Sequence, residues 1–251
     1  MTVPEIMSQL EAMGSESIKK ILVKHGIKEP FFGVKVADLK PIQKKVKKDY
    51  ELAKGLFATG NADAMYLAGL IADDAAMTID DLNTWAKHAT SNNISEYTVP
   101  WVAAEGTHGW ELAKNWINDT HEHVAAAGWS TLSNLVALKP DSELDIPALK
   151  SLMKRVEETI RSAPNRVRYT MNGFLISAGA YVTALKDEAI ATAERIGSVE
   201  VDMNGTACKV PGVKDYIQKI ADRGNLGKKK KTGKCKCRLK IFDLMSAVSR
   251  Y

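Results

Sequence analysis

The side chains with the clearest chemical character lie in a lysine-rich stretch near the C-terminus: Lys228, Lys229, Lys230, Lys231, Lys234 and Lys236. Residues 205–240 carry 12 Lys/Arg and 2 Asp/Glu, a net +10, whereas residues 1–204 carry a net −5. Closely spaced cations of this kind are typical of a phosphate-binding segment. A localisation signal or an adventitious tail is the alternative. Residues 223–237 cannot pack a core, which predicts that they are flexible when unbound.

A second group of polar side chains shares one predicted helix, 165–182. Arg166, Arg168, Tyr169 and Asn172 fall outside its apolar stripe. Guanidinium, phenol and amide groups on one helix surface can bind the phosphates of DNA. The alternative is an ordinary solvated helix face. We favour DNA contact for these four residues.

The sequence shows no convincing site for a metal ion or a cofactor. Cys235, Cys237 and Cys208 offer three thiols, but no fourth ligand lies at a convincing spacing for zinc. His121 and His123 are two residues apart, which separates them around a helix. The chain has neither a phosphate-cradling glycine loop nor a nucleophile elbow. We therefore expect no metal and no cofactor.

The composition is that of a globular protein, with 45% hydrophobic and 26% charged residues in 251. No apolar run reaches the roughly 18 residues of a membrane span, and the N-terminal residues do not resemble a signal peptide. Three late, closely spaced cysteines cannot form a disulfide framework for a domain of this size. We expect a cytoplasmic protein, monomeric and not bound to a membrane.

Apolar residues recur at helical spacing along most of the chain. The predicted helices cover 3–13, 16–25, 36–48, 50–58, 61–72, 79–89, 94–105, 109–117, 121–137, 146–160, 165–182, 185–196 and 212–222. Thr78 and Asp81 have the spacing of a capping box. Short connections between amphipathic helices predict an all-α superhelix of HEAT-like repeats, a C-shaped solenoid. We expect one helical domain, 1–223, followed by a basic tail, 224–251.

One segment departs from the helical pattern. Residues 199–203 alternate between apolar and polar, Asn204 and Gly205 follow, and 206–210 continue the alternation. Asn-Gly between two alternating runs is a strong hairpin signal. The sequence predicts a small β-hairpin near 199–210.

Three stretches resemble the AlkD-like DNA alkylation repair family, a group of DNA glycosylases in the HEAT-like repeat superfamily. They are Gly26–Leu39 with its Phe-Gly-Val, Glu96–Trp101 with its Val-Pro, and the Trp110–Ile117 helix with the Ala-rich helix after it. The resemblance covers roughly residues 15–196. It implies a concave surface that grips double-stranded DNA and hydrolysis of the glycosidic bond of alkylated, cationic purines. A carboxylate can stabilise the sugar cation and activate water in such a reaction.

In this resemblance Glu96 takes the place of the family's catalytic Asp. Asn92 and Asn93 stand where the family has paired Trp, and Phe174 stands at a further Trp position. Structural roles are the alternative: Glu96 is favoured in the first turn of a helix by the helix dipole, and Phe174 belongs to the apolar stripe that faces the core. Asn92 and Asn93 could contact a nucleotide, but we favour capping of the helix start for both. Three hypotheses follow: a glycosylase acting through Glu96, a non-catalytic binder of DNA structure, and a protein-interaction scaffold.

Overall fold

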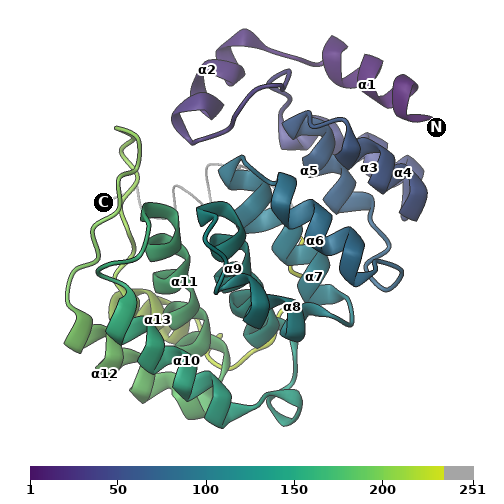
Figure 1. The fold of residues 1–251 in the computed structure, drawn as a ribbon. Coiled ribbons are helices and arrows are strands. Elements are labelled where there is room, and N and C mark those ends of the chain that lie inside the picture. The colour runs from purple at the N-terminus through teal and green to yellow at the C-terminus, as the bar shows by residue number, and fades with distance from the viewer. Residues whose placement is uncertain (235–251) are drawn as a thin grey trace.

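The computed structural model describes residues 1–234 and shows a chain of helices joined by short loops (Figure 1). The α-helices of this part are α1 (Val3–Ala12), α2 (Glu16–Lys24), α3 (Val36–Val46), α4 (Tyr50–Ala58), α5 (Ala62–Ile71), α6 (Ile79–His88), α7 (Val99–Glu105), α8 (Gly109–Trp116), α9 (Glu122–Leu138), α10 (Ile146–Thr159), α11 (Asn165–Tyr181), α12 (Lys186–Ile196) and α13 (Val213–Asp222). A π-helical segment, η1 (Ile94–Thr98), precedes α7. The predicted order of helices is confirmed.

Helices that are close in sequence pack on one another along most of the chain, and the molecule runs from α1 and α2 at one end to α12 and α13 at the other (Figure 1). The long helix α9 is central, since it packs against α7, α8 and α11. Neighbour-on-neighbour packing is the arrangement expected of a helical solenoid. The predicted all-α superhelix is therefore confirmed.

Local side-chain chemistry explains where several helices begin. The Thr2 and Glu5 side chains form a capping box at α1, and Thr78 and Asp81 form the predicted one at α6. The Asn61 carboxamide accepts hydrogen bonds from two backbone N–H groups at the start of α5. Such caps satisfy N–H groups that have no partner within the helix.

Two hydrophobic clusters form the core. One joins α1 and α3–α6, the other joins α10–α13, and α7, α8 and α9 contribute side chains to both. The indole of Trp129 and the ring of Phe174 are fully buried, with ring centroids 5.5 Å apart. Phe174 thus belongs to the core, as its apolar stripe predicted.

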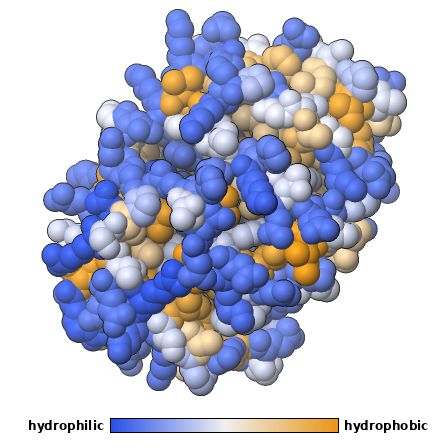
Figure 2. All heavy atoms as spheres, viewed as in Figure 1, coloured by the Kyte–Doolittle hydropathy of each residue, from blue (hydrophilic) through white to orange (hydrophobic). Residues whose placement is uncertain are grey.

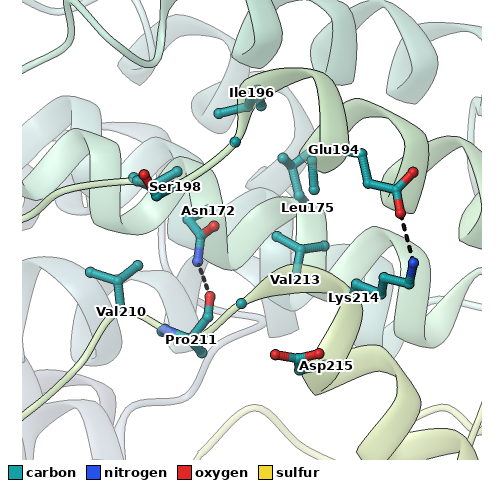
Figure 3. A pocket seen from close by; sticks show the side chains of 14 residues that line it. Asn172, Leu175, Glu194, Ile196, Ser198, Val210, Pro211, Val213, Lys214 and Asp215 are labelled. Atoms are coloured by element: carbon teal, nitrogen blue, oxygen red, sulfur yellow. Dashed lines mark hydrogen bonds and ion pairs between the residues drawn. The ribbon is translucent and has the colours of Figure 1, made fainter.

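The predicted β-hairpin is wrong. Residues 198–212 form no strand, although Asn204 and Gly205 do make a turn, with φ of 55° and 67°. The arms of this loop bond to side chains of α11 instead of to a β-ladder. The Asn165 carboxamide bonds to both backbone groups of Asp202, at 2.7 and 2.9 Å. Pro211, which has no N–H to donate, accepts a hydrogen bond from Asn172 (Figure 3).

No helix among residues 1–234 is long and apolar enough to cross a membrane.

Candidate functional site

The acidic residue at the catalytic position of the resemblance lies in η1. Pro100 lacks the N–H that would bond to the carbonyl of Glu96 in an α-helix, and the chain widens to a π-turn in which the N–H of Val99 bonds to the carbonyl of Ile94. Gly69 of α5 lets η1 approach closely, because a Cβ there would lie 2.4 Å from Cγ2 of Thr98. The backbone of η1 is therefore firmly positioned.

The carboxylate of Glu96 forms a two-point ion pair with the guanidinium of Arg166, at the start of α11. Nε donates to Oε1 at 2.6 Å and Nη2 donates to Oε2 at 2.7 Å. The two side chains are only 2% and 15% exposed. This planar, two-point geometry is the strongest form of ion pair available to a carboxylate.

Neighbouring groups hold the guanidinium in this position. It lies over the ring of Tyr169, 4.4 Å from the centroid, and Nη1 contacts the sulfur of Met203 at 3.7 Å. The backbone N–H of Arg166 donates to the Glu122 carboxylate at 2.6 Å. Tyr169 is in turn hydrogen-bonded to Tyr97. The pair is thus part of a network that joins η1, α9 and α11.

The titration of these groups reflects their burial. Burial raises the pKa of the Glu96 carboxyl, and the guanidinium of Arg166 offsets part of that rise. Burial also raises the pKa of Tyr97 well above its ordinary value, and raises that of Tyr169, with the charge of Glu96 adding to both. The phenols remain neutral at physiological pH, where they can only share hydrogen bonds.

The arrangement restricts what Glu96 can do chemically. A general base or a stabiliser of a sugar cation needs a carboxylate oxygen within reach of the substrate. Both oxygens of Glu96 instead bond to one guanidinium, inside the protein. The two asparagines beside it are not caps, contrary to expectation. Asn92 donates to the carbonyl of His25, and the Asn93 side chain makes no cap hydrogen bond.

The predicted DNA contacts on α11 mostly bond within the protein. Arg166 is occupied by Glu96, Tyr169 lies beneath it, and Asn172 holds Pro211. Arg168 differs, because its Nε is buried and has no hydrogen-bond partner within residues 1–234. DNA binding by these four residues stays a prediction.

The first part of the predicted flexible tail is bound to the protein. Residues 224–234, which we call the C-terminal strap, cross the C-terminal ends of three inner helices (Figure 1, yellow). The N–H of Gly227 donates to Ala180 at the end of α11, and the N–H of Lys230 donates to Ala137 in the last turn of α9. Thr232 donates to the carboxylate of Glu105, where α7 ends.

Two of the predicted phosphate-binding lysines bond within the protein. Lys234 lies 2.7 and 2.9 Å from the two carboxylate oxygens of Asp74 and also donates to the carbonyl of Ala72, just beyond α5. Lys229 lies 2.7 Å from the Asp141 carboxylate and donates to the carbonyl of Val136. The partial negative charge at a helix C-terminus also stabilises the ammonium groups of lysines that lie there.

The remaining lysines of that run differ from these two. Lys228 and Lys231 are exposed, and the ammonium of Lys230 lies 5.0 Å from the ring centre of Tyr181. Lys236, with Cys235 and Cys237, lies outside the described residues. Phosphate binding by the lysines of this run stays a prediction, as does the boundary of the helical domain at 223.

No sequence pattern identified the groups that accept hydrogen bonds from the strap. Asp74 follows the predicted helix 61–72, and Glu105 ends the predicted helix 94–105. Acidic side chains at such places can attract cations, but no sequence pattern paired these two with residues over a hundred positions away. Among residues 1–234, no group of three or more His, Cys, Asp or Glu side chains could hold a metal ion.

A model of the family described as DNA alkylation repair enzyme matches residues 6–207. The chain belongs to this family.

Several known proteins are similar to this member of the DNA alkylation repair family along nearly the whole chain. Two uncharacterised proteins, Lin0241 of Listeria innocua and Lmo0209 of Listeria monocytogenes, are each 30% identical to it. The matches cover 89% and 88% of this chain and 99% and 98% of theirs. One solved structure has a TM-score of 0.86 at 36% identity, over 94% of this chain and all of that one. It represents a new family of proteins related to the HEAT-like repeat DNA glycosylases, with affinity for branched DNA structures.

Proposed function

We propose that this member of the DNA alkylation repair family binds branched DNA and releases no base from it. The observation that carries the proposal is the Glu96–Arg166 ion pair. The carboxylate that a glycosylase would present to the sugar is 2% exposed, and both of its oxygens accept hydrogen bonds from one guanidinium.

The surroundings of Glu96 support the same conclusion. An aromatic face beside the sugar would attract the positive charge that develops during base release. Asn92 and Asn93 stand where the resemblance places the paired Trp of the glycosylases. The Asn92 side chain donates to the carbonyl of His25 at the end of α2. Phe174 is fully buried against Trp129. The aromatic side chains near Glu96 are those of Tyr97 and Tyr169. The ring of Tyr169 lies beneath the guanidinium of Arg166, and the two phenols share a hydrogen bond.

Binding of branched DNA is favoured over binding of a protein partner by two observations. The similar solved structure, at 36% identity, belongs to a family with affinity for branched DNA structures. The chain carries a net charge of +5, and its cations are concentrated rather than dispersed. Concentrated cations bind phosphates and release counterions, which makes the affinity depend steeply on salt.

The proposal predicts a preference for junctions over linear DNA of the same composition. We expect the protein to bind a four-way junction several-fold more tightly than a linear duplex with the same number of nucleotides, and both affinities to fall as salt rises. Fluorescence anisotropy at two salt concentrations would measure this. Equal affinity for the two substrates would contradict a preference for branches. Absence of binding to either would contradict the proposed function altogether.

A further inference from the structure

A second concentration of positive charge lies near the N-terminus. Residues 17–48 contain ten lysines and two acidic residues, a net +8. The negative total of residues 1–204 conceals this stretch, because the acidic residues lie elsewhere. Several of the lysines are exposed and have no ion-pair partner in the described structure: Lys20, Lys24, Lys28, Lys35, Lys44, Lys45 and Lys47.

Three of these lysines belong to α2 and the loop after it. Lys20 and Lys24 are one turn apart, which places them about 6 Å from each other along the same side of the helix. Lys28 follows at the same interval in sequence. Lys19, on the same helix, is already paired with Glu29 at 2.9 Å. The three exposed lysines form a cationic row at the edge of the molecule.

The structure also joins this row to the Glu96 region. The backbone N–H of Lys28 donates to the hydroxyl of Ser91 at 2.8 Å, and Asn92 bonds through its backbone to Gly26 and through its side chain to His25. Gly26 has a φ of 79° and no Cβ, which allows Asn92 to approach. Ser91 and Asn92 lead directly into η1. The row therefore extends from the middle of α2 to the loop that precedes η1.

Two apolar side chains accompany the lysines on α2. Val23 is 53% exposed and Ile21 is 37% exposed, and no residue of α2 is fully buried. An apolar patch surrounded by hydrophilic atoms covers this helix (Figure 2). Apart from Met1, these are the only large apolar side chains that residues 1–234 expose to this degree. Exposed apolar side chains beside unpaired lysines suit a binding partner that carries negative charge and also presents an apolar surface.

We propose that this basic α2 face, formed by Lys20, Ile21, Val23, Lys24 and Lys28, binds a branched nucleic acid at its branch point. The lysines bind phosphates of one arm, and Val23 and Ile21 pack against bases left unstacked at the branch. Apolar side chains beside lysines contact unstacked bases in this way in proteins that bend DNA. The inference rests on the proposed function and adds the surface that would distinguish a branch from a linear duplex.

A pair of variants with the same spacing tests the role of the lysines. Lys20→Gln with Lys24→Gln removes two cations from α2, and Lys150→Gln with Lys154→Gln removes two exposed cations, also one turn apart, from α10. We expect the α2 variant to bind the four-way junction several-fold more weakly and to lower the slope of log affinity against log salt by about 1.8. The α10 variant should show much smaller changes. Equal effects of the two would overturn the inference while leaving the proposed function intact.

A third variant tests the apolar contact. Val23→Ser removes an exposed apolar group without changing charge, so folding should be unaffected. We expect it to weaken junction binding by a few-fold and to leave binding of the linear duplex unchanged, measured side by side with wild type. Equal loss on both substrates, or on neither, would overturn the base contact. Binding of α2 to vesicles of anionic lipid, lost in the lysine variant while junction binding persists, would assign this face to a membrane surface instead.

Discussion

Replacing Arg166 by methionine is expected to lower the free energy of unfolding by about 3–5 kcal/mol, the usual cost of removing one partner of a buried ion pair. The substitution keeps much of the apolar volume of the side chain but leaves the Glu96 carboxylate, 2% exposed, without its guanidinium. It also removes the cation that lies over Tyr169. Urea denaturation monitored by tryptophan fluorescence would measure the change.

The effect of this substitution should depend on pH in a defined direction. Burial raises the pKa of Glu96 above its ordinary value of 4.5, and without Arg166 nothing offsets that rise. The folded variant then binds a proton more tightly than the unfolded chain, so its stability falls as pH increases through the raised pKa. We expect a smaller loss at pH 5 than at pH 8. The double variant Glu96→Leu, Arg166→Met should regain most of the stability. A single variant within 1 kcal/mol of wild type at both pH values would refute the structural role of the pair.

Replacing Lys234 by methionine is expected to lower the free energy of unfolding by about 3 kcal/mol. The ammonium group donates to Oδ2 of Asp74 and to the carbonyl of Ala72, and it lies 2.7 Å from Oδ1 of Asp74; the two charged side chains are 12% and 5% exposed. Burial raises the pKa of Asp74, and Lys234 opposes that rise. The variant would leave a buried carboxylate whose remaining cation, Lys48, is 3.6 Å away and largely exposed.

Lys231→Met provides the matched control, because Lys231 belongs to the same strap but is exposed. We expect it to change stability by less than about 0.5 kcal/mol. Neither substitution should remove the preference for branched DNA, because Lys231 and Lys234 do not belong to the basic α2 face that we propose as the contact with the branch point. If both variants were equally stable, the strap would not be held as the structure shows.

Much of the fold could be predicted because its signals are local. Helical spacing of apolar residues and the Thr78 capping box depend on residues close in sequence, and they located the helices correctly. The burial of Phe174 followed from the same periodicity. The hairpin signal was also local, but it concerned only the turn. Asn204 and Gly205 do turn the chain, while the arms depend on distant partners on α11, which the alternation of residues 199–210 did not reveal.

The candidate site depended on contacts between distant residues, and there the sequence was less informative. Arg166 and Glu96 are 70 positions apart, and an exposed helix face was as good an account of Arg166 as an ion pair. The carbonyls and carboxylates that bind Lys229 and Lys234 lie 88 to 162 positions away. A lysine-rich stretch predicts affinity for anions, but it does not say whether the anions belong to DNA or to the ends of the protein's own helices.

The apolar spacing of this chain builds the HEAT-like fold. The acidic residue that the resemblance places at the catalytic position, Glu96, is here one end of a buried ion pair. Glu96, Arg166 and Tyr169 then join η1 to α11. We propose that this ion pair stabilises the fold at the position where a glycosylase would hold its catalytic carboxylate.

The most direct test of this account is base release from duplex DNA that carries N7-methylguanine or N3-methyladenine, measured for wild type and for Glu96→Gln. We expect no release above the spontaneous rate for either protein, from preparations that bind a four-way junction. Release by wild type that disappears in Glu96→Gln would contradict it, because it would show that Glu96 leaves its ion pair with Arg166 and acts on the sugar as a catalytic carboxylate.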